Sequence, residues 1–123
     1  MDYRTAWEER IKEDEEKRLG LFREARDAAA RAARILIDEF DARRVYLFGS
    51  LLTSEDFTEH SDIDLAVEGL KDELFFKALN RVWNALPKGM ELDLVPIEDA
   101  DEYIKAKIFS TGAILYEREL ACP

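Results

Sequence analysis

The hydrophobic period of this chain changes at residue 43, and that change restricts the fold to classes that mix helices with strands. Over residues 21–40 apolar side chains recur at helical spacing, which predicts one amphipathic helix. These apolar residues are Phe22, Ala25, Ala29, Ala32, Leu36 and Phe40. The next stretch, "RRVYLF" at 43–48, is rich in β-branched and aromatic residues and ends at a Gly-Ser pair, so we expect a strand.

The remainder of the chain continues to alternate between the two periods. The predicted strands are 62–67, 90–96 and 113–118, and the predicted helices are 72–86 and 99–110. Asp72 and Asp99 are the expected N-caps of these helices, and Gly112 is the expected stop of the second. This order predicts a two-layer α/β (α+β) domain, in which helices pack on one side of a small mixed β-sheet.

A highly charged helix is predicted over residues 2–19, before the main domain. Tyr3, Trp7 and Ile11 form a thin apolar stripe on it at a spacing of four. We expect Gly20 to interrupt or bend the helix, which divides the chain into an extension (1–20), a domain (21–118) and a tail (119–123). So narrow a stripe suggests contact with a partner or with a second copy of the chain, so a homo-oligomer is one expectation.

Composition excludes several classes of protein. The 123 residues include 28 acidic and 18 basic ones, a net charge of -10, and such a chain repels a phosphate backbone, so autonomous nucleic-acid binding is not expected. No apolar run approaches the length of a membrane span, and the start of the chain lacks the pattern of a signal peptide. Cys122 is the single cysteine, so no internal disulfide is expected. These features fit a cytoplasmic protein.

Two aspartates lie on one face of the predicted strand 62–67. Because successive strand residues point to opposite faces, Asp62 and Asp64 share the face opposite the apolar side chains, with Cα atoms roughly 6.5–7 Å apart. About six acidic pairs at this spacing are expected from composition alone, so the pair by itself is a weak signal. Asp93, within "ELDLV", strengthens it because its side chain also points away from the apolar face of its strand.

The local chemistry of these acids favours a bound cation. Like charges held together on a sheet repel one another and raise their pKa values, whereas a divalent cation makes the same cluster favourable. Gly49 and Ser50 follow the strand 43–48, where a glycine permits close approach of a ligand and a helical turn would direct free N–H groups outward. A Gly-Ser pair alone is more often a simple turn, but its position near the aspartates favours a phosphate site.

These residues together resemble a known family. The pattern "FGS" followed by "SDIDLAV", with the later "LDLV" and "KIFSTGAILYER", is similar to the nucleotidyltransferase superfamily that includes DNA polymerase β. The likeness is greatest to its minimal nucleotidyltransferase (MNT) group and covers residues 30–118. It implies a nucleotidyltransferase fold and a Mg²⁺-dependent reaction, with Mn²⁺ as the alternative metal, that transfers AMP from ATP to a hydroxyl group and releases pyrophosphate.

The resemblance also implies a role for each residue of the motif. Gly49 and Ser50 would hold the triphosphate of the nucleotide. Asp62 and Asp64 would bind the metal, and Asp93 would complete the site of the catalytic metal and assist deprotonation of the attacking hydroxyl. Two metal ions can together stabilise the attacking and leaving oxygens of such a displacement, so these roles agree with the chemistry.

The acceptor and the partner also follow from the resemblance. Many MNT proteins act as antitoxins of HEPN-domain toxins, and some attach AMP to a tyrosine of the toxin, so a separate HEPN-domain protein is the expected partner. One departure stands out: Thr53 and Ser54 occupy the positions where members often have Arg and a second Gly. Two alternatives therefore stay open, which are a weak or inactive MNT-like protein that acts by binding a partner, and a standalone transferase of a small hydroxyl substrate.

Overall fold

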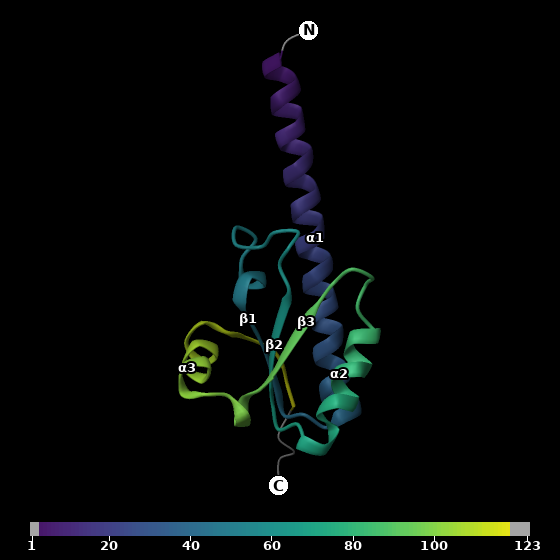
Figure 1. The fold of residues 1–123 in the computed structure, drawn as a ribbon, viewed down its shortest axis with the longest axis vertical. Coiled ribbons are helices and arrows are strands. Elements are labelled where there is room, and N and C mark those ends of the chain that lie inside the picture. Colours follow the sequence, from purple (N-terminus) through teal and green to yellow (C-terminus); the bar gives the residue numbers. More distant parts are fainter. Residues whose placement is uncertain (1–2, 119–123) are drawn as a thin grey trace.

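The computed structural model describes residues 3–118, within which helices and strands follow the predicted order (Figure 1). The helices are α1 (Tyr3–Phe40), α2 (Phe75–Asn84) and α3 (Glu102–Thr111), and the strands are β1 (Arg44–Phe48), β2 (Ile63–Glu68), β3 (Leu92–Pro96) and β4 (Ala113–Glu117). Cys122 and the predicted tail 119–123 lie outside the described residues. In the described part of the chain, no helix has both the length and the apolar character needed to cross a bilayer.

The strands form one mixed sheet in the order β3-β2-β1-β4. β1 pairs antiparallel with both β2 and β4, whereas β2 and β3 are parallel. A parallel pair requires a crossover connection, and the segment that contains α2 provides it between β2 and β3. The prediction of a mixed sheet is confirmed, and the parallel pair decides which residues of β2 and β3 become neighbours.

One face of the sheet packs against α1 and α2 and forms the main core. Alternate residues of the two central strands point into it, among them Val45, Leu47 and Leu65, which are fully buried. The C-terminal half of α1 contributes small and aliphatic side chains to the same core. Its buried residues are Ala25, Ala28, Ala29, Ala32, Ala33, Leu36, Ile37 and Phe40. The alanines let the helix lie close to the strands, as the amphipathic pattern predicts.

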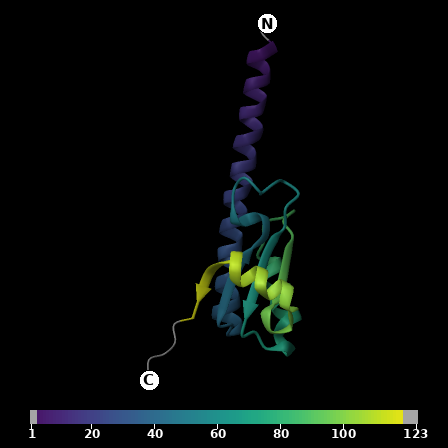
Figure 2. The same cartoon turned by 90° about the vertical axis from the view of Figure 1, so that its left-hand side faces the viewer.

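The third helix lies on the other face of the sheet, contrary to the expectation of helices on one side. Figure 2 shows α3 crossing the sheet on the face opposite α1. Ile108 of α3 is buried in a second, smaller cluster with Tyr46, Phe48 and Ala66, which alternate with the core residues of β1 and β2. α3 shields the aromatic side chains of β1 on this face from solvent. The domain therefore has three layers instead of two.

The first helix is continuous from Tyr3 to Phe40, so the prediction that Gly20 interrupts it is wrong. A glycine in a helix interior costs only about 1 kcal/mol relative to alanine, which is too little to end a helix of 38 residues. Gly20 stands where the helix leaves the domain, with nothing near a side chain built there. The division of the chain at residue 20 stays a prediction.

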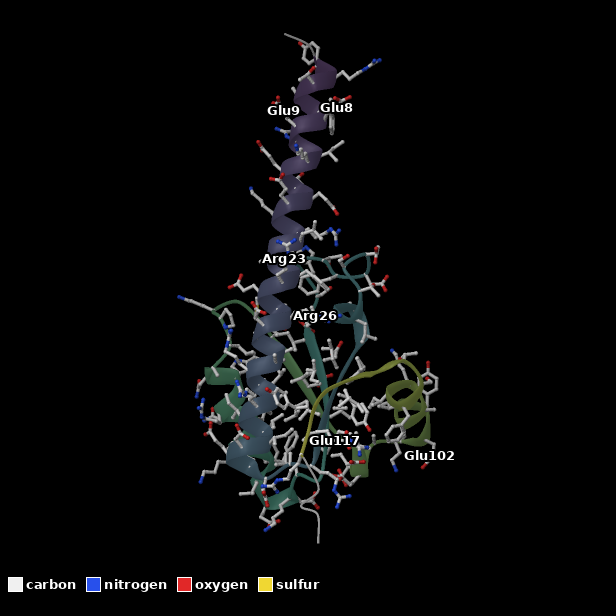
Figure 3. The ribbon with its side chains drawn as sticks, turned by 180° about the vertical axis from the view of Figure 1, so that it is seen from behind. Glu8, Glu9, Arg23, Arg26, Glu102 and Glu117 are labelled. Carbon is white, nitrogen blue, oxygen red and sulfur yellow. The ribbon has the colours of Figure 1, made fainter. Side chains whose placement is uncertain are left out.

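The N-terminal half of α1 projects away from the rest of the protein (Figures 1 and 3). In Figure 3 the side chains of its first turns, Glu8 and Glu9 among them, extend from a helix with no other element beside it. The predicted apolar stripe is exposed: Tyr3 keeps 80%, Trp7 62% and Ile11 60% of its surface. The stripe thus contributes nothing to the core of this domain, which is consistent with the expected contact with a partner or a second copy.

The ends of the shorter helices differ in detail from the predictions. Asp101, and not Asp99, caps α3, because its carboxylate accepts a hydrogen bond of 2.8 Å from the Ile104 N–H. Asp72 begins a short 3-10 turn that precedes α2, and no side chain caps α2 itself. The predicted stop at Gly112 is confirmed, since its N–H donates to the carbonyl at the end of α3. Both aspartates of "DAD" have the chemistry of a cap, so only the local backbone decides between them.

Candidate functional site

The pairing of the strands brings two of the predicted aspartates together. Asp64 of β2 and Asp93 of β3 are register partners in the parallel pair. Neighbouring strands lie about 4.8 Å apart, so the two residues stand side by side and point to the same face, the one on which α3 lies. Asp62 precedes the first residue of β2 and is exposed. The parallel register thus brings Asp93 to the pair formed by Asp62 and Asp64, at one end of the sheet.

The same register brings the Gly-Ser pair to the aspartates. Phe48, the last residue of β1, is opposite Asp64 on the side away from Asp93. Gly49 follows with a φ of 78°, a left-handed conformation that favours glycine. A Cβ atom at this position would collide with the Asp64 carboxylate. The glycine is required for two independent reasons, which are its backbone conformation and the close approach of Asp64.

Ser50 lies in a single 3-10 turn that runs from Gly49 to Leu52. The turn therefore begins at the predicted glycine, beside the carboxylates. Leu51 anchors it in the main core, where its side chain is fully buried. The sequence-based expectation of a helical turn at this point agrees with the structure, and the role of Gly49 and Ser50 in holding phosphate stays a prediction.

The electrostatics of the site centre on Asp64. Burial, which is the largest cause, and the neighbouring carboxylates of Asp93 and Asp62 together raise the pKa of this carboxyl to about 6. The Lys107 ammonium of α3 opposes them and lowers the pKa of Asp64. The net shift is upward, so the protein holds a carboxyl group where its charged form is disfavoured. A positive ligand at this point would relieve that cost.

The metal-binding roles of Asp62, Asp64 and Asp93 stay predictions. Among residues 3–118 no group of three or more His, Cys, Asp or Glu side chains is arranged to hold a metal ion. The donors nevertheless suit a hard divalent cation, which takes carboxylate oxygens together with water and substrate phosphates. Burial and then repulsion by Asp93 and Asp62 raise the pKa of Asp64, and a bound cation would offset both costs.

The region that contains these residues matches a known family. Residues 31–120, most of the chain, match the family model described as polymerase beta, nucleotidyltransferase. The chain belongs to this nucleotidyltransferase family. The matched region includes Gly49, Ser50 and all three aspartates, so the family assignment and the geometry concern the same part of the molecule.

Solved structures share the fold of this nucleotidyltransferase. A chain of a toxin–antitoxin complex with AMP-PNP aligns with a TM-score of 0.58 and 21% identity, covering 73% of this chain and 74% of that chain. The MntA–HepT toxin–antitoxin complex aligns with a TM-score of 0.55 and 21% identity, covering 76% and 73%. A tri-AMPylated Shewanella oneidensis HEPN toxin in complex with its MNT antitoxin gives 0.56 and 21%, also covering 76% and 73%. Among curated proteins none matches the chain.

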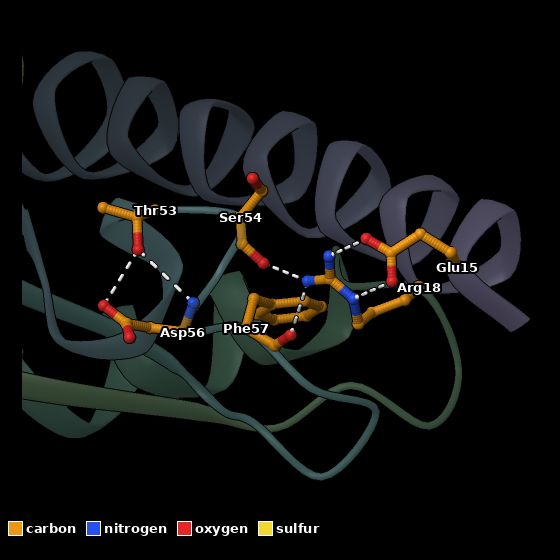
Figure 4. Close-up of polar contacts among 6 residues, drawn as sticks. All are labelled: Glu15, Arg18, Thr53, Ser54, Asp56 and Phe57. Atoms are coloured by element: carbon orange, nitrogen blue, oxygen red, sulfur yellow. Dashed lines mark hydrogen bonds and ion pairs between the residues drawn. The ribbon is translucent and has the colours of Figure 1, made fainter. Parts of the chain in front are cut away.

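Two arginines of α1 hold the loop that joins the Gly-Ser turn to β2. Arg26 donates from Nε to the Leu51 carbonyl at 3.0 Å and from Nη2 to the Leu52 carbonyl at 2.6 Å. Arg18 donates to the Ser54 carbonyl and, at 3.1 Å, to the Phe57 carbonyl (Figure 4). Neither arginine was predicted from the sequence. The available signal was their position near the apolar side of a helix that otherwise buries alanines.

Other parts of the loop are held by its own side chains. Thr53 donates from Oγ1 to the Asp56 carboxylate at 2.8 Å (Figure 4). The Thr58 N–H donates to Ser61 Oγ at 2.9 Å. Glu15 in turn contacts the guanidinium of Arg18. The loop of this nucleotidyltransferase is therefore fixed from both sides, by α1 and by its own turns, so the Gly49 turn has a defined position next to Asp64.

Lys107 is a further residue near the site that was not predicted from the sequence. It lies on α3, more than 40 positions after Asp64 in the chain, and reaches the site only because α3 packs across the sheet. No local pattern connects this lysine to the aspartates. The influence of its charge on Asp64 makes it the basic member of an otherwise acidic site.

Proposed function

We propose that this protein is a Mg²⁺-dependent nucleotidyltransferase that transfers AMP from ATP to a hydroxyl group on a HEPN-domain partner protein. One observation carries the proposal: the Gly49 turn, Asp64 and Asp93 converge at one end of the sheet, in a chain whose family is that of nucleotidyltransferases. The fold shared with MNT antitoxin–HEPN toxin complexes supports the choice of partner. Mn²⁺ is the alternative metal.

The residues divide the reaction between them. Asp62, Asp64 and Asp93 would hold the metal, which when bound neutralises phosphate charge and lowers the cost of charge on the reacting oxygens. The turn at Gly49 and Ser50 would receive the triphosphate, because its backbone approaches the carboxylates without a side chain in between. Arg26 and Arg18 act indirectly, since Arg26 fixes the end of this turn and Arg18 fixes the loop that follows it.

The bond changes follow from this arrangement. The acceptor oxygen attacks the α-phosphorus of ATP, the bond between the α-phosphorus and its bridging oxygen breaks, and pyrophosphate leaves. The acceptor proton passes to a carboxylate, for which Asp93 is the proposed group. Little further chemistry is required of the protein, because orientation of the two reactants and stabilisation of charge supply most of the acceleration in reactions of this kind.

Nucleotide binding is the first test. We would titrate ATP, GTP, CTP and UTP, each with and without Mg²⁺, and follow thermal unfolding of the wild type and of Asp64→Asn. A nucleotide at about one hundred times its dissociation constant adds about 2.7 kcal/mol to the free energy of unfolding, which raises the midpoint by several degrees. We expect a Mg²⁺-dependent rise with ATP that Asp64→Asn abolishes. No rise with any nucleotide would count against the proposal.

Transfer is the second test, and it uses the purified HEPN-domain partner. ATP labelled in the α-phosphate should pass its label to the partner, whereas ATP labelled in the γ-phosphate should not. Asp64→Asn should reduce labelling at least a hundredfold. Glu68→Gln is the matched control, because Glu68 lies on the same strand and face but at the opposite end, beside Arg44. Equal loss in both variants would argue against a site at the aspartates.

A second candidate function is partner binding without catalysis. The exposed stripe of Tyr3, Trp7 and Ile11 favours it, as does the absence of an arginine at Thr53 and Ser54. AMP transfer requires the aspartates of the site, whereas partner binding alone does not. If Asp64→Asn neutralises the HEPN-domain toxin as well as the wild type does, binding suffices and AMP transfer is not the biological activity.

A further inference from the structure

The loop that would face the phosphates carries no lysine or arginine. Between Gly49 and Ser61 the charged residues are Glu55, Asp56 and Glu59, with one histidine. Together with the three aspartates of the site, they would repel a nucleoside triphosphate. The arginines that reach this loop from α1 donate to backbone carbonyls and fix its position. Positive charge for the phosphates therefore has to come from elsewhere in the fold.

The end of α3 lies against the end of β1, directly before the Gly49 turn. Ile108 is fully buried and packs with Tyr46 and Phe48 of β1. The N–H of Gly112 donates to the Ile108 carbonyl at 2.8 Å, and a Cβ atom on Gly112 would lie 3.4 Å from the Leu47 carbonyl. The last turns of α3 are thus held close to the strand whose end leads into the phosphate turn.

This packing decides where Lys107 stands. The lysine is next to the buried Ile108, which packs on Phe48, and Phe48 is the register partner of Asp64. Its ammonium is near enough to the Asp64 carboxylate to act on it. Among residues 3–118 Lys107 makes no ion pair, whereas Lys105 on the same helix pairs with Glu102 at 3.8 Å. The packing of α3 therefore places an exposed cation near the site, where it is available to a ligand.

We propose that Lys107 binds the phosphate groups of the nucleotide and supplies from α3 the positive charge that the loop after Gly49 lacks. The inference rests on the proposed function, since it assumes a nucleotide between the carboxylates and the Gly49 turn. A lysine is a compact, strongly hydrated charge that contacts phosphate without a fixed geometry. Because α3 is already packed on the sheet, the backbone of Lys107 does not have to move when the nucleotide binds.

The test measures dissociation constants for ATP, ADP and AMP by calorimetry in the presence of Mg²⁺. The proteins are the full chain as wild type, Lys107→Gln, Lys107→Arg and the matched control Lys105→Gln. We expect Lys107→Gln to weaken ATP binding about tenfold or more, ADP binding less and AMP binding least, because the loss follows the number of phosphates. Lys107→Arg should restore most of the affinity, and Lys105→Gln should match the wild type.

Each of the other outcomes has a definite meaning. Unchanged ATP affinity in Lys107→Gln, or a loss of equal size for all three nucleotides, would overturn the role of Lys107. A loss of the same size in Lys105→Gln would do so as well, since it would reflect the charge of the helix as a whole. In those cases Asp64-dependent binding by the wild type would leave the proposed function intact. No nucleotide binding by the wild type would overturn both.

Discussion

The two faces of the sheet carry different kinds of side chain, although the same strands build both. Toward α1 and α2, β2 presents Leu65 and Val67, which are fully buried. Toward α3 the same strand presents Asp64, Ala66 and Glu68, of which only Ala66 is buried. Alternate strand residues point in opposite directions, so one segment of six residues can serve a core and a polar site at once.

The difference follows from how much of each face is covered. On the core face, the C-terminal half of α1 and one side of α2 bury a continuous set of aliphatic side chains. On the other face, α3 has only ten residues and covers mainly Tyr46, Phe48 and Ala66. The acids at one end of that face stay partly exposed. We infer that the core face provides stability and that the α3 face provides function.

The largest expected effect on stability comes from the core face. Leu65→Ala removes a fully buried side chain next to Asp64 in the chain and should lower the free energy of unfolding by about 2–5 kcal/mol. Glu68→Gln, on the opposite face of β2, removes one ion pair with Arg44 at 3.7 Å and should cost about 0–1 kcal/mol. Urea unfolding measures both. Equal losses would contradict the division between the faces.

Substitution of Gly49 tests the contact between the Gly49 turn and the Asp64 carboxylate. Gly49→Ala places a methyl group against the Asp64 carboxylate in a left-handed conformation, and should cost about 1–3 kcal/mol. Gly20→Ala is the matched control, because it lies in a helix with open space around it and should gain about 0.5–1 kcal/mol. Urea unfolding gives both values. A neutral Gly49→Ala variant would mean that the turn and Asp64 are not in contact.

The ionisation of Asp64, on the α3 face, should make the free energy of unfolding depend on pH. Folding raises the pKa of Asp64 from 3.8 to about 6, so between these values the folded state binds more protons than the unfolded state. Stability from this group is present below pH 4 and is lost as the pH rises through 6. Asp64→Asn removes the effect, and should gain about 1 kcal/mol relative to wild type between pH 4 and pH 7. Solvent screening of this partly exposed side chain keeps the gain small.

Urea unfolding of the two proteins at both pH values, without divalent cations, measures that difference. A gain for Asp64→Asn that is the same at pH 4 and pH 7 would show that ionisation of Asp64 is not its source. If Asp64→Asn instead lowered the free energy of unfolding at pH 7, the folded protein would favour the charged form of Asp64.

The smallest effect on stability is expected in the exposed half of α1. The double change Trp7→Ala with Ile11→Ala should alter the free energy of unfolding by less than about 0.5 kcal/mol, since both side chains are exposed. It should instead reduce self-association or affinity for the HEPN-domain partner, and deletion of residues 1–19 should do the same without unfolding 21–118. Sedimentation and partner titration measure this. If both stay unchanged, the stripe is not a binding surface.

Local patterns of residues were enough to predict the order of the helices and strands, the residues that share a strand face, and the candidate site residues. Periods of 3.6 and 2 are local properties of a chain, so the alternation of Asp64 with Leu65 could be predicted without knowledge of the fold. The glycine before Ser50 could be predicted for a similar reason, because a sharp turn after a strand has a limited choice of residues. The first residues of the helices could be predicted less well, because no side chain caps α2 and Asp101 caps α3.

Which distant residues meet depends on strand register and helix packing. Asp93 stands beside Asp64 because β3 pairs with β2 in one parallel register, and Lys107 acts on Asp64 because α3 packs on the face opposite α1. α1 continues through Gly20 because the whole helix outweighs the cost of one glycine. Arg18 reaches the Phe57 carbonyl because the helix and the loop pack together. Contacts of this kind depend on register and packing between separate segments, and no local pattern of residues contains that information.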